Sequence, residues 1–384
     1  MGLPPPNDDR RRHLRSFVPG EDGQLKPNGL SGDVHPPLLD LASNDYLGLS
    51  RHPAVTSAAA DELHRSGLGS GGSRLVSGSR PVHERLEHRL ASWLQRDRVL
   101  LFPSGFQANL AAVAALADRH SLVLADRLIH HSLLVGVRCS GARLQRFAHN
   151  SLEDLDAQLG RARQADPNRR LVVLSESLFS MEGTSPPIEA LVALCRRHAA
   201  ALLLDEAHAL GVLGPGGRGL AYGHQPIGLI SGTFGKALGS GGAFVAGDAS
   251  TMDHLLQSSG AFRYTTALAP PLAAGALAAL ELLQSSPELG ANLLQRCQRW
   301  RAELVGSGWP LPAGIGPIVP LVVGSDAAAL ALQARLELEG LLCVAIRPPT
   351  VPEGTARLRL VVHHQLPPGS LGQLLKALGP GPCK

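Results

Sequence analysis

The sequence predicts an α/β protein with a large domain on a mostly parallel sheet and a smaller α+β domain after it. Two observations support this prediction. Short apolar runs of strand length alternate with helical stretches between residues 99 and 246, as in βαβ units. Beyond residue 270 the order becomes two helices followed by a β, α, β, β, α series. We expect an arm over 1–45, a large domain over 46–270 and a small domain over 271–384.

The elements of the large domain follow from periodicity and from helix start signals. Leu39–Ser43 ends the polar arm, and helices are expected over 53–65, 81–95 and 105–117, the second beginning at a proline. Aromatic residues make up only 4% of the chain, so aliphatic side chains must fill the core. The expected strands are Val99–Phe102, Leu122–Ala125, Leu171–Leu174, Ala201–Asp205, Gly228–Ser231 and Ala243–Ala246.

The elements of the small domain are expected from the same two periodicities. Helices are predicted over 272–283, 288–305, 327–339 and 369–378, and strands over 318–323, 343–346 and 356–362.

Composition excludes several classes of protein. A hydrophobic content of 44% with 18% charged residues is too apolar for a disordered chain, and the 43 glycines have no three-residue period. The net charge of +4 is spread along the chain, and the five cysteines are unclustered. The longest apolar run, 110–117, is too short to span a bilayer. We expect a cytoplasmic protein that binds no metal, nucleic acid or membrane.

Three motifs suggest other chemistry, and each lacks its required context. Gly67–Gly72 matches Gly-x-Gly-x-x-Gly, but a helix precedes it where a dinucleotide site needs a strand. His83 and His88 are five residues apart, about 140° around a helix, so a solvated face is expected rather than a zinc site. Lys236 follows Gly235, but the remaining P-loop residues are missing. An NAD oxidoreductase using the glycine loop is the alternative from a different class, as is a cofactor-binding protein without catalysis.

Asp205 and Lys236 point to a pyridoxal phosphate site. Each follows a predicted buried strand, and the carboxyl ends of such strands meet where α/β sheets bind ligands. A lysine can form a Schiff base with the cofactor aldehyde, and an aspartate can pair with its protonated ring nitrogen. Considered alone, Asp205 would be interpreted as a helix N-cap or a metal ligand, and Lys236 as an exposed charge in a loop.

Three further segments can account for the rest of this cofactor. The backbone N–H groups of Gly105 and Phe106 are expected at a helix N-terminus, where a phosphate binds readily. Thr233 could add a hydroxyl to the same phosphate. His130, which follows another predicted strand, could stack on the ring.

Five segments together resemble the α-oxoamine synthase family of fold-type I pyridoxal phosphate enzymes, over about residues 40–365. These segments are Ser43–Gly48, Gly69–Gly78, Ser104–Asn109, Asp205–His208 and Thr233–Lys236. The resemblance implies the aspartate aminotransferase-like fold of PLP-dependent transferases. Members of this family join an amino acid to an acyl thioester with loss of carbon dioxide.

The resemblance also implies roles at matching positions. Lys236 matches the Schiff-base lysine, Asp205 the partner of the ring nitrogen, His208 the residue that bonds the phenolic oxygen, and His130 the stacking histidine. Lys236, His208 and His130 are therefore the expected catalytic residues, with His130 also against substrate. The other implied cofactor contacts are Gly105, Phe106, Ser180 and Thr233.

Substrate contacts are implied in the same way. Asn44 and Arg359 match groups that hold the substrate carboxylate, which suits a guanidinium fork. Thr350 matches a contact near the acyl chain, and Arg15 is the candidate for an arm arginine that reaches substrate.

Residues 345–360 look most like the biotin-pathway member, which uses L-alanine and a pimeloyl thioester of coenzyme A or a carrier protein. The alternative is a glycine-using relative, 2-amino-3-ketobutyrate CoA ligase or 5-aminolevulinate synthase, because one methyl group is worth only about 1–3 kcal/mol in a pocket. The family further implies a homodimer with shared active sites, in which Thr265 or Thr266 reaches the partner's phosphate.

Overall fold

The computed structural model describes residues 8–28, 36–310 and 314–381. The chain divides into two compact units. Unit 1 comprises Met1–Tyr46, Ser180–Thr184 and Asn292–Lys384, and unit 2 comprises Leu47–Phe179 and Ser185–Ala291. The three-part division expected from the sequence stays a prediction, and Cys383 lies outside the described residues.

Unit 2 is built on a seven-stranded sheet of order β4-β10-β9-β8-β7-β5-β6. The five strands from β9 to β6 run parallel, whereas β10 is antiparallel to both β4 and β9. The sheet is therefore mostly parallel, as predicted. Its strands are β4 (Arg98–Phe102), β5 (Leu122–Asp126), β6 (Arg143–Phe147), β7 (Leu171–Glu176), β8 (Ala201–Asp205), β9 (Leu229–Thr233) and β10 (Ala243–Gly247).

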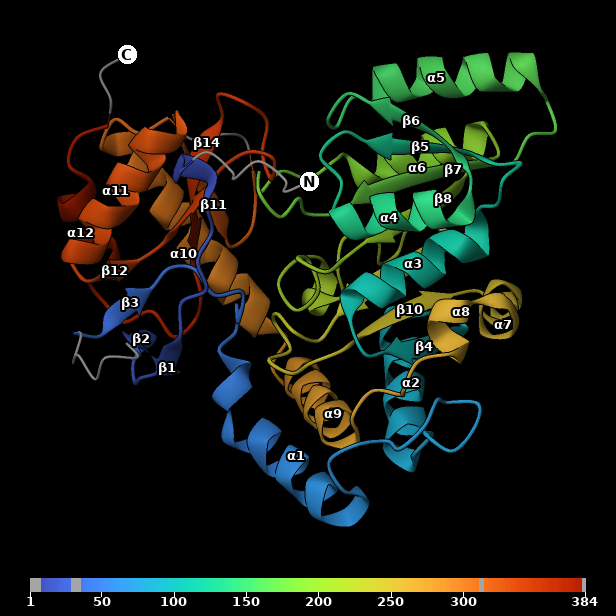
Figure 1. Cartoon of the computed structure of the whole chain (residues 1–384), viewed down its shortest axis with the longest axis horizontal. Helices are drawn as coiled ribbons and strands as arrows, with labels where there is room; N and C mark the ends of the chain where they lie inside the picture. The colour runs from blue at the N-terminus through green and yellow to red at the C-terminus, as the bar shows by residue number, and fades with distance from the viewer. Residues whose placement is uncertain (1–7, 29–35, 311–313, 382–384) are drawn as a thin grey trace, which may run out of the picture. The chain divides into compact units, whose positions relative to one another are not determined.

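Helices cover both faces of this sheet (Figure 1). Side chains alternate along β5, where Val123 packs toward α3, α4, α7 and α8 while Leu122 and Leu124 pack toward α5 and α6. Burial on both faces explains why the central strands read as continuous apolar runs. The helices of unit 2 are α1 (Pro53–Ser66), α2 (Pro81–Leu94), α3 (Gly105–Leu116), α4 (His131–Ser140), α5 (Leu152–Ala165), α6 (Ile188–Arg197), α7 (Ala249–Ser258), α8 (Gly260–Arg263) and α9 (Pro270–Ser285), with 3-10 turns η2 (Leu49–Arg51) and η3 (Pro215–Gly217).

Two local features of unit 2 differ from expectation. Strand β6 was not predicted, because this edge strand is polar in sequence and half exposed. The solvated-face reading of α2 is wrong for His83, which is fully buried with its Nε2 2.8 Å from the main-chain oxygen of Leu268. His88 is exposed as expected. The cover over His83 comes from a segment 185 residues away, which helical periodicity cannot reveal.

Unit 1 contains two small sheets, one of order β1-β2-β3-β12 and the other of order β11-β14-β13. Strand β14 lies between β11 and β13 and is antiparallel to both. The strands are β1 (Phe17–Pro19), β2 (Gln24–Pro27), β3 (Leu38–Asp40), β11 (Ile318–Gly324), β12 (Leu341–Leu342), β13 (Val344–Ile346) and β14 (Ala356–Val361). The helical elements are η1 (Asp8–Arg10), α11 (Asp326–Leu338) and α12 (Ser370–Leu378), while α10 (Glu288–Gly306) begins in unit 2 and continues into unit 1.

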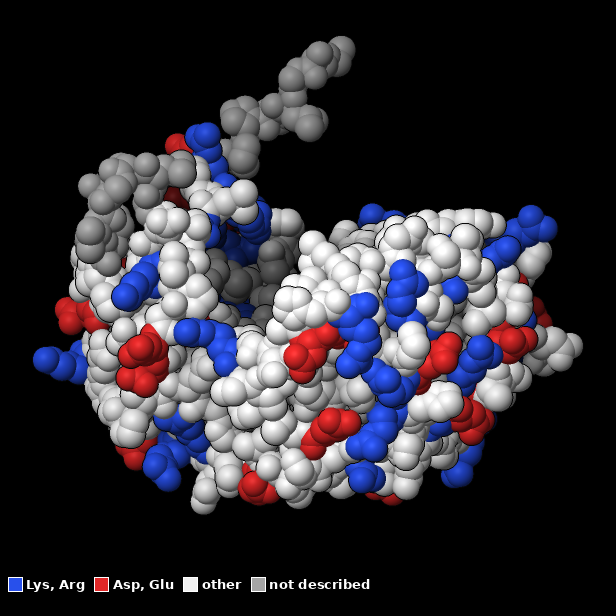
Figure 2. All heavy atoms as spheres, turned by 90° about the horizontal axis from the view of Figure 1, so that it is seen from below, with Lys and Arg blue, Asp and Glu red and all other residues white. Residues whose placement is uncertain are grey.

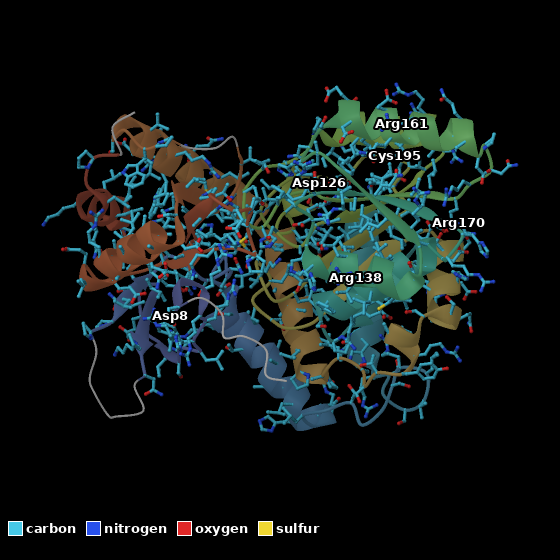
Figure 3. All side chains as sticks on the ribbon, turned by 45° about the horizontal axis from the view of Figure 1, so that its top comes forward. Asp8, Asp126, Arg138, Arg161, Arg170 and Cys195 are labelled. Carbon is cyan, nitrogen blue, oxygen red and sulfur yellow. The ribbon has the colours of Figure 1, made fainter. Side chains whose placement is uncertain are left out.

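Charged side chains lie mostly on the surface. Acidic and basic groups are interspersed on the face drawn in Figure 2. Arg138, Arg161 and Arg170 of unit 2 are exposed, whereas Cys195 is buried on α6 (Figure 3). In the described part of the chain, no helix is both long enough and apolar enough to cross a membrane.

Candidate active site

Polar residues end the neighbouring strands at the carboxyl edge of the unit 2 sheet. Asp126, Glu176, Asp205 and Thr233 are the last residues of β5, β7, β8 and β9. The parallel register places Glu176 opposite Asp205 and Asp205 opposite Ser231. This edge is where open α/β sheets bind ligands, so the fold gathers acidic and hydroxyl groups at a ligand-binding position.

Asp205 is held by two N–H donors. Its carboxylate accepts hydrogen bonds from Asn109 Nδ2 at 2.8 Å and from the backbone N–H of Ala207 at 2.9 Å. Its main-chain oxygen accepts from the N–H of Ser177 at 2.9 Å. The side chain is only 6% exposed. A buried carboxylate with two N–H donors is preorganised as an anion that can face a protonated ring nitrogen.

His130 is fixed at the start of α4. Its backbone N–H donates to Glu176 Oε1 at 2.6 Å, and its Nδ1 accepts from the N–H of Ser132 at 3.3 Å. Burial lowers the pKa of His130, Asp205 opposes this, and Lys236 and His131 lower it further. The lowered pKa favours the neutral form of the His130 ring. Because the charges of Asp205 and Lys236 both act on this ring, the structure gathers these three predicted residues in one region.

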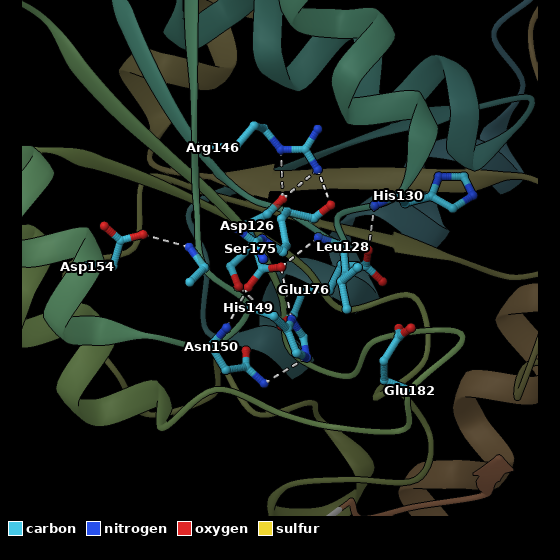
Figure 4. A network of polar contacts seen from close by, with 12 residues as sticks. Asp126, Leu128, His130, Arg146, His149, Asn150, Asp154, Ser175, Glu176 and Glu182 are labelled. Atoms are coloured by element: carbon cyan, nitrogen blue, oxygen red, sulfur yellow. Dashed lines mark hydrogen bonds and ion pairs between the residues drawn. The ribbon is translucent and has the colours of Figure 1, made fainter. Parts of the chain in front are cut away.

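A buried network holds the loop that carries His130 (Figure 4). Asp126 is fully buried and accepts from the N–H of Leu128 at 2.8 Å, from His149 Nδ1 at 2.9 Å and from the N–H of Asn150 at 2.8 Å. The rings of His149 and Phe179 pack nearly perpendicular to each other, with centroids 4.5 Å apart. The loop between β5 and α4 is thus bonded to buried carboxylates near both of its ends.

The start of α3 offers a phosphate-binding surface. An ideal Cβ built on Gly105 would lie 3.9 Å from Thr233 Cβ, so these two predicted residues are neighbours. Thr233 Oγ1 accepts from the N–H of Gly235 at 3.2 Å and donates to a main-chain oxygen. Phe106 is 43% exposed, and Gln107 Nε2 donates to Thr265 Oγ1 at 3.0 Å. A helix N-terminus with an adjacent hydroxyl suits an anion.

Lys236 and His208 lie in the segments that follow β9 and β8. Lys236 is half-buried and His208 is buried. Glu206 follows Asp205 in the sequence, and its carboxylate accepts a hydrogen bond from Ser177 Oγ at 2.9 Å. The same carboxylate accepts from the backbone N–H groups of Leu220 and Ala221 at 3.1 and 2.5 Å. Burial raises the pKa of Glu206 to about 7 against the effect of these bonds.

In unit 1, Arg359 on β14 gathers two other predicted residues. Its Nε donates to the main-chain oxygen of Ser180 at 2.6 Å, and its Nη2 donates to Asn44 Oδ1 at 2.9 Å. Tyr46 donates to the same Asn44 oxygen at 3.2 Å, and burial raises the pKa of Tyr46 to about 12. Ser180, expected as a cofactor contact, thus contacts Arg359 through its backbone. A buried guanidinium aligned by neutral oxygens retains its charge for a carboxylate.

A cavity of about 700 Å³ in unit 1 is lined by both Arg15 and Thr350. Arg12 Nη2 donates to Thr350 Oγ1 at 3.3 Å, whereas Arg15 Nη1 lies 2.6 Å from Glu337 Oε1. Apolar walls from β12 and β13 include Leu342. Cationic groups beside an apolar wall suit an alkyl chain that ends in an anion.

Sequence reasoning missed several polar partners of the predicted residues. Asn109 is the last residue of the Ser104–Asn109 segment, and a lone amide in the apolar helix α3 was a usable signal. Ser132 lies two residues after His130, and nothing in the sequence marked its hydroxyl as a partner of that ring. Arg12 belongs to the run of three arginines in the N-terminal arm, and nothing in the sequence indicated that it, rather than Arg15, would contact Thr350. Glu176 ends a strand as Asp205 does, and only the register shows that the two are adjacent.

The donor set of unit 2 fits the groups of pyridoxal phosphate. Lys236 carries an amine that can join an aldehyde, Asp205 carries a carboxylate that can pair with a ring nitrogen, and the start of α3 carries N–H donors that can bind a phosphate. Thr233 places a hydroxyl beside those N–H groups, and His130 carries a flat ring whose lowered pKa favours the neutral form.

Comparison with known proteins gives the same picture. Residues 36–378 match the family described as aminotransferase class I and II. The 8-amino-7-oxononanoate synthase of Chromohalobacter salexigens is 44% identical over 360 residues, which cover 93% of this chain and 92% of that protein. A serine palmitoyltransferase from S. paucimobilis, solved with bound PLP and myriocin, superposes with a TM-score of 0.88 at 27% identity, covering 94% of this chain and 91% of that one. The crystal structure of 8-amino-7-oxononanoate synthase from Francisella tularensis gives a TM-score of 0.74 at 26% identity, covering 89% and 96%.

These matches confirm the predicted fold class, that of fold-type I PLP-dependent transferases, and the family resemblance seen in the sequence. The chain belongs to the aminotransferase class I and II family and, within it, to the α-oxoamine synthase enzymes that include the 8-amino-7-oxononanoate synthases.

Proposed function

We propose that this enzyme uses pyridoxal phosphate to condense L-alanine with a pimeloyl thioester, giving 8-amino-7-oxononanoate, carbon dioxide and a free thiol for biotin biosynthesis. The observation that carries the proposal is the buried Asp205 carboxylate, bonded by two N–H donors and acting on His130 together with Lys236. The names of relatives that are 41–45% identical support the choice of substrates.

The residues of unit 2 bind the cofactor and move protons. When bound, pyridoxal phosphate withdraws electrons from the Cα of an attached amino acid, which allows that carbon to lose a proton or carbon dioxide. Lys236 would hold the cofactor through its Nζ, and the same amine is the base that would take the Cα proton of alanine. Asp205 would pair with the ring nitrogen, His130 would offer its ring to the cofactor ring, and His208 would donate a hydrogen bond to a cofactor oxygen.

The residues of unit 1 select the substrates. Arg359 and Asn44 hold the alanine carboxylate, with Arg359 fixed in place by the main-chain oxygen of Ser180. The cavity beside Thr350 binds the pimeloyl chain, and the terminal carboxylate of that chain pairs with an arginine of the N-terminal arm. Arg15 is the residue expected from the sequence, and the Arg12–Thr350 hydrogen bond makes Arg12 the second candidate.

A second copy of the chain completes the proposed assembly. Leu68, Val76 and Tyr264 are 75%, 83% and 79% exposed on two segments that adjoin, because Ser70 Oγ donates to the main-chain oxygen of Leu268 at 2.7 Å. Thr265 lies beside the start of α3 and is the candidate to cross this interface, with Thr266 as the alternative. Analytical ultracentrifugation tests this assembly. The wild-type protein is expected to sediment as a dimer, and the Val76→Asp variant as a monomer. A cytoplasmic location stays a prediction.

Thiol release tests the substrates directly. Pimeloyl, succinyl, acetyl and palmitoyl thioesters are each paired with alanine, glycine and serine, and the carbon dioxide and product are quantified. The proposal requires the highest kcat/KM for pimeloyl with alanine. A preference for acetyl or succinyl with glycine would identify a glycine-using relative and overturn the substrate assignment.

The arm arginines are tested with the same assay. Removing the one that meets the distal carboxylate raises KM for the pimeloyl thioester but not for a thioester with an uncharged chain end. Arg12→Ala and Arg15→Ala are compared for this selective loss.

The visible absorption spectrum tests the cofactor anchor. Lys236→Ala is expected to abolish the visible absorption that arises when pyridoxal phosphate is joined to a lysine, with Lys376→Ala on α12 as the matched control. An unchanged spectrum in Lys236→Ala would rule out this anchor.

A further inference from the structure

The anion partner of the site and its stacking histidine are joined by a chain of hydrogen bonds. Asn109 Nδ2 lies 2.8 Å from Asp205 Oδ2 and 2.9 Å from Ser132 Oγ. Ser132 Oγ lies 2.7 Å from His130 Nδ1. Asn109 is 3% exposed and Ser132 is fully buried, so water does not compete for these bonds.

The direction of each bond follows from the groups at the two ends. Asp205 can only accept, so the Asn109 amide must turn its NH₂ toward it, and the two N–H bonds go to Asp205 and Ser132. At the other end the backbone N–H of Ser132 points at His130 Nδ1, so this nitrogen must accept. The Ser132 hydroxyl, already accepting from Asn109, therefore donates to the same Nδ1.

The orientation of the Asn109 amide leaves one of its own polar atoms unpaired, which indicates that neighbouring groups impose this orientation. Among the described residues, Asn109 Oδ1 is a buried oxygen with no hydrogen-bond partner. Leaving such an oxygen unpaired in the core is unfavourable. The opposite rotamer would place this oxygen against the Asp205 carboxylate, which is worse, so Asp205 fixes the amide.

The packing of two helices allows the bridge. Asn109 lies on α3 and Ser132 on α4, and the helices approach closely at Gly136. A Cβ at Gly136 would lie 3.0 Å from the Val113 side chain and 3.4 Å from the main-chain oxygen of Asn109. The absence of a side chain at Gly136 keeps α4 within reach of the amide.

We propose that Asn109 and Ser132 are positioning residues that connect Asp205 to His130 and hold His130 in one orientation as the neutral tautomer with its proton on Nε2. This inference rests on the proposed function only in that Asp205 and His130 are the residues that face the cofactor. Its consequence is that the ring-nitrogen partner and the stacking ring are set together rather than independently. The other charged or titratable groups near His130 are Glu176, His131 and Lys236.

Histidine NMR of the cofactor-free full chain tests the bridge without using activity. In ¹⁵N-histidine-labelled protein, His130 Nδ1 is expected to be unprotonated and Nε2 protonated. Ser132→Ala removes the hydroxyl donor, which lies 2.7 Å from Nδ1, and leaves only the longer bond from the backbone N–H at 3.3 Å. The Nε2–H tautomer therefore loses population, and the pKa of His130 rises. Ser140→Ala, at the other end of α4 with its hydroxyl on the main-chain oxygen of Val137, is the matched control. A protonated Nδ1 in the wild type, or equal effects of the two variants, overturns the proposal.

Cofactor affinity supplies the second readout. Dissociation constants and induced circular dichroism of pyridoxal phosphate are measured for Asn109→Ala, Ser132→Ala and the double variant, after thermal unfolding shows that each is folded. Each single change is expected to weaken binding by about tenfold, the loss of one buried hydrogen bond to a charged or coupled group. The double variant should lose much less than the product of the two, because both break the same chain. Multiplicative effects refute the bridge.

The two readouts separate the two proposals. If wild-type protein fails to bind pyridoxal phosphate while His130 shows the expected tautomer and its dependence on Ser132, the proposed function fails and the bridge stands. If the wild type binds the cofactor but the tautomer does not depend on Ser132, the bridge fails and the function stands.

Discussion

Gly219→Ala should destabilise the protein much more than Gly223→Ala, because only the first glycine faces the Glu206 carboxylate. Both glycines lie in the segment after β8 with left-handed backbone, φ +86° and +84°. An ideal Cβ at Gly219 would collide with Glu206 Oε2. Apart from the adjacent residues of the chain, no atom of the described residues lies within 4 Å of a Cβ at Gly223. The pair therefore separates backbone strain from collision with a buried carboxylate.

The expected magnitudes follow from the contacts. Either alanine costs about 1–2 kcal/mol for a left-handed non-glycine residue. At position 219 the carboxylate must also move away, and it accepts from the N–H groups of Leu220 and Ala221 and from Ser177 Oγ. Loss of one bond to a buried charged group adds about 1.5–3 kcal/mol. We expect a total of about 2.5–5 kcal/mol for Gly219→Ala and about 1–2 kcal/mol for Gly223→Ala.

Urea denaturation followed by circular dichroism measures both values, with m-values compared to verify that the same transition is observed. Gly219→Ala combined with Glu206→Ala adds a double-mutant cycle. If collision with the carboxylate is the cause, the glycine change costs less in the Glu206→Ala background. Equal destabilisation at 219 and 223, or additive effects with Glu206→Ala, would refute the reasoning.

Three further outcomes are expected. Because burial raises the folded pKa of Glu206 from 4.5 to about 7, the folded state binds more protons than the unfolded state between these pH values, and stability falls as pH rises through that window. Glu206→Gln should remove this loss, worth about 3 kcal/mol, from unfolding curves measured at pH 4 and pH 8. Arg359→Lys keeps the charge but loses the fork that bonds Ser180 and Asn44, so KM for alanine should rise about tenfold or more with a smaller change for the thioester. Thiol labelling of native protein should reach Cys139 on α4, while the three cysteines whose pKa burial raises to about 12 react only after unfolding: Cys195, Cys297 and Cys343.

The sequence predicted the parts of the fold that depend on local pattern. Strands that are buried over most of their length, such as β5 and β8, appear in the sequence as apolar runs. The prolines that predicted the starts of α1 and α2 lie at the N-termini of those helices. It failed at β6, whose pairing with β5 comes from sheet geometry rather than from apolar content. Burial of His83 also depends on a distant segment.

The same limit applies to the site, where residue identity was easier to infer than the bonds between residues. Asp205 and Lys236 stood out as a pair, because each comes at or after the end of a predicted buried strand and the carboxyl ends of such strands meet where α/β sheets bind ligands. Asn109 carried a weaker signal of the same kind, a buried amide in an apolar helix, but its partners belong to β8 and α4, and only packing brings them together. The Asn109 amide donates one N–H to Asp205 and the other to Ser132, while its oxygen has no hydrogen-bond partner among the described residues. These two neighbours therefore determine the orientation of the amide. A polar residue in an otherwise apolar segment of this chain is therefore best interpreted by tracing every donor and acceptor it brings into the core.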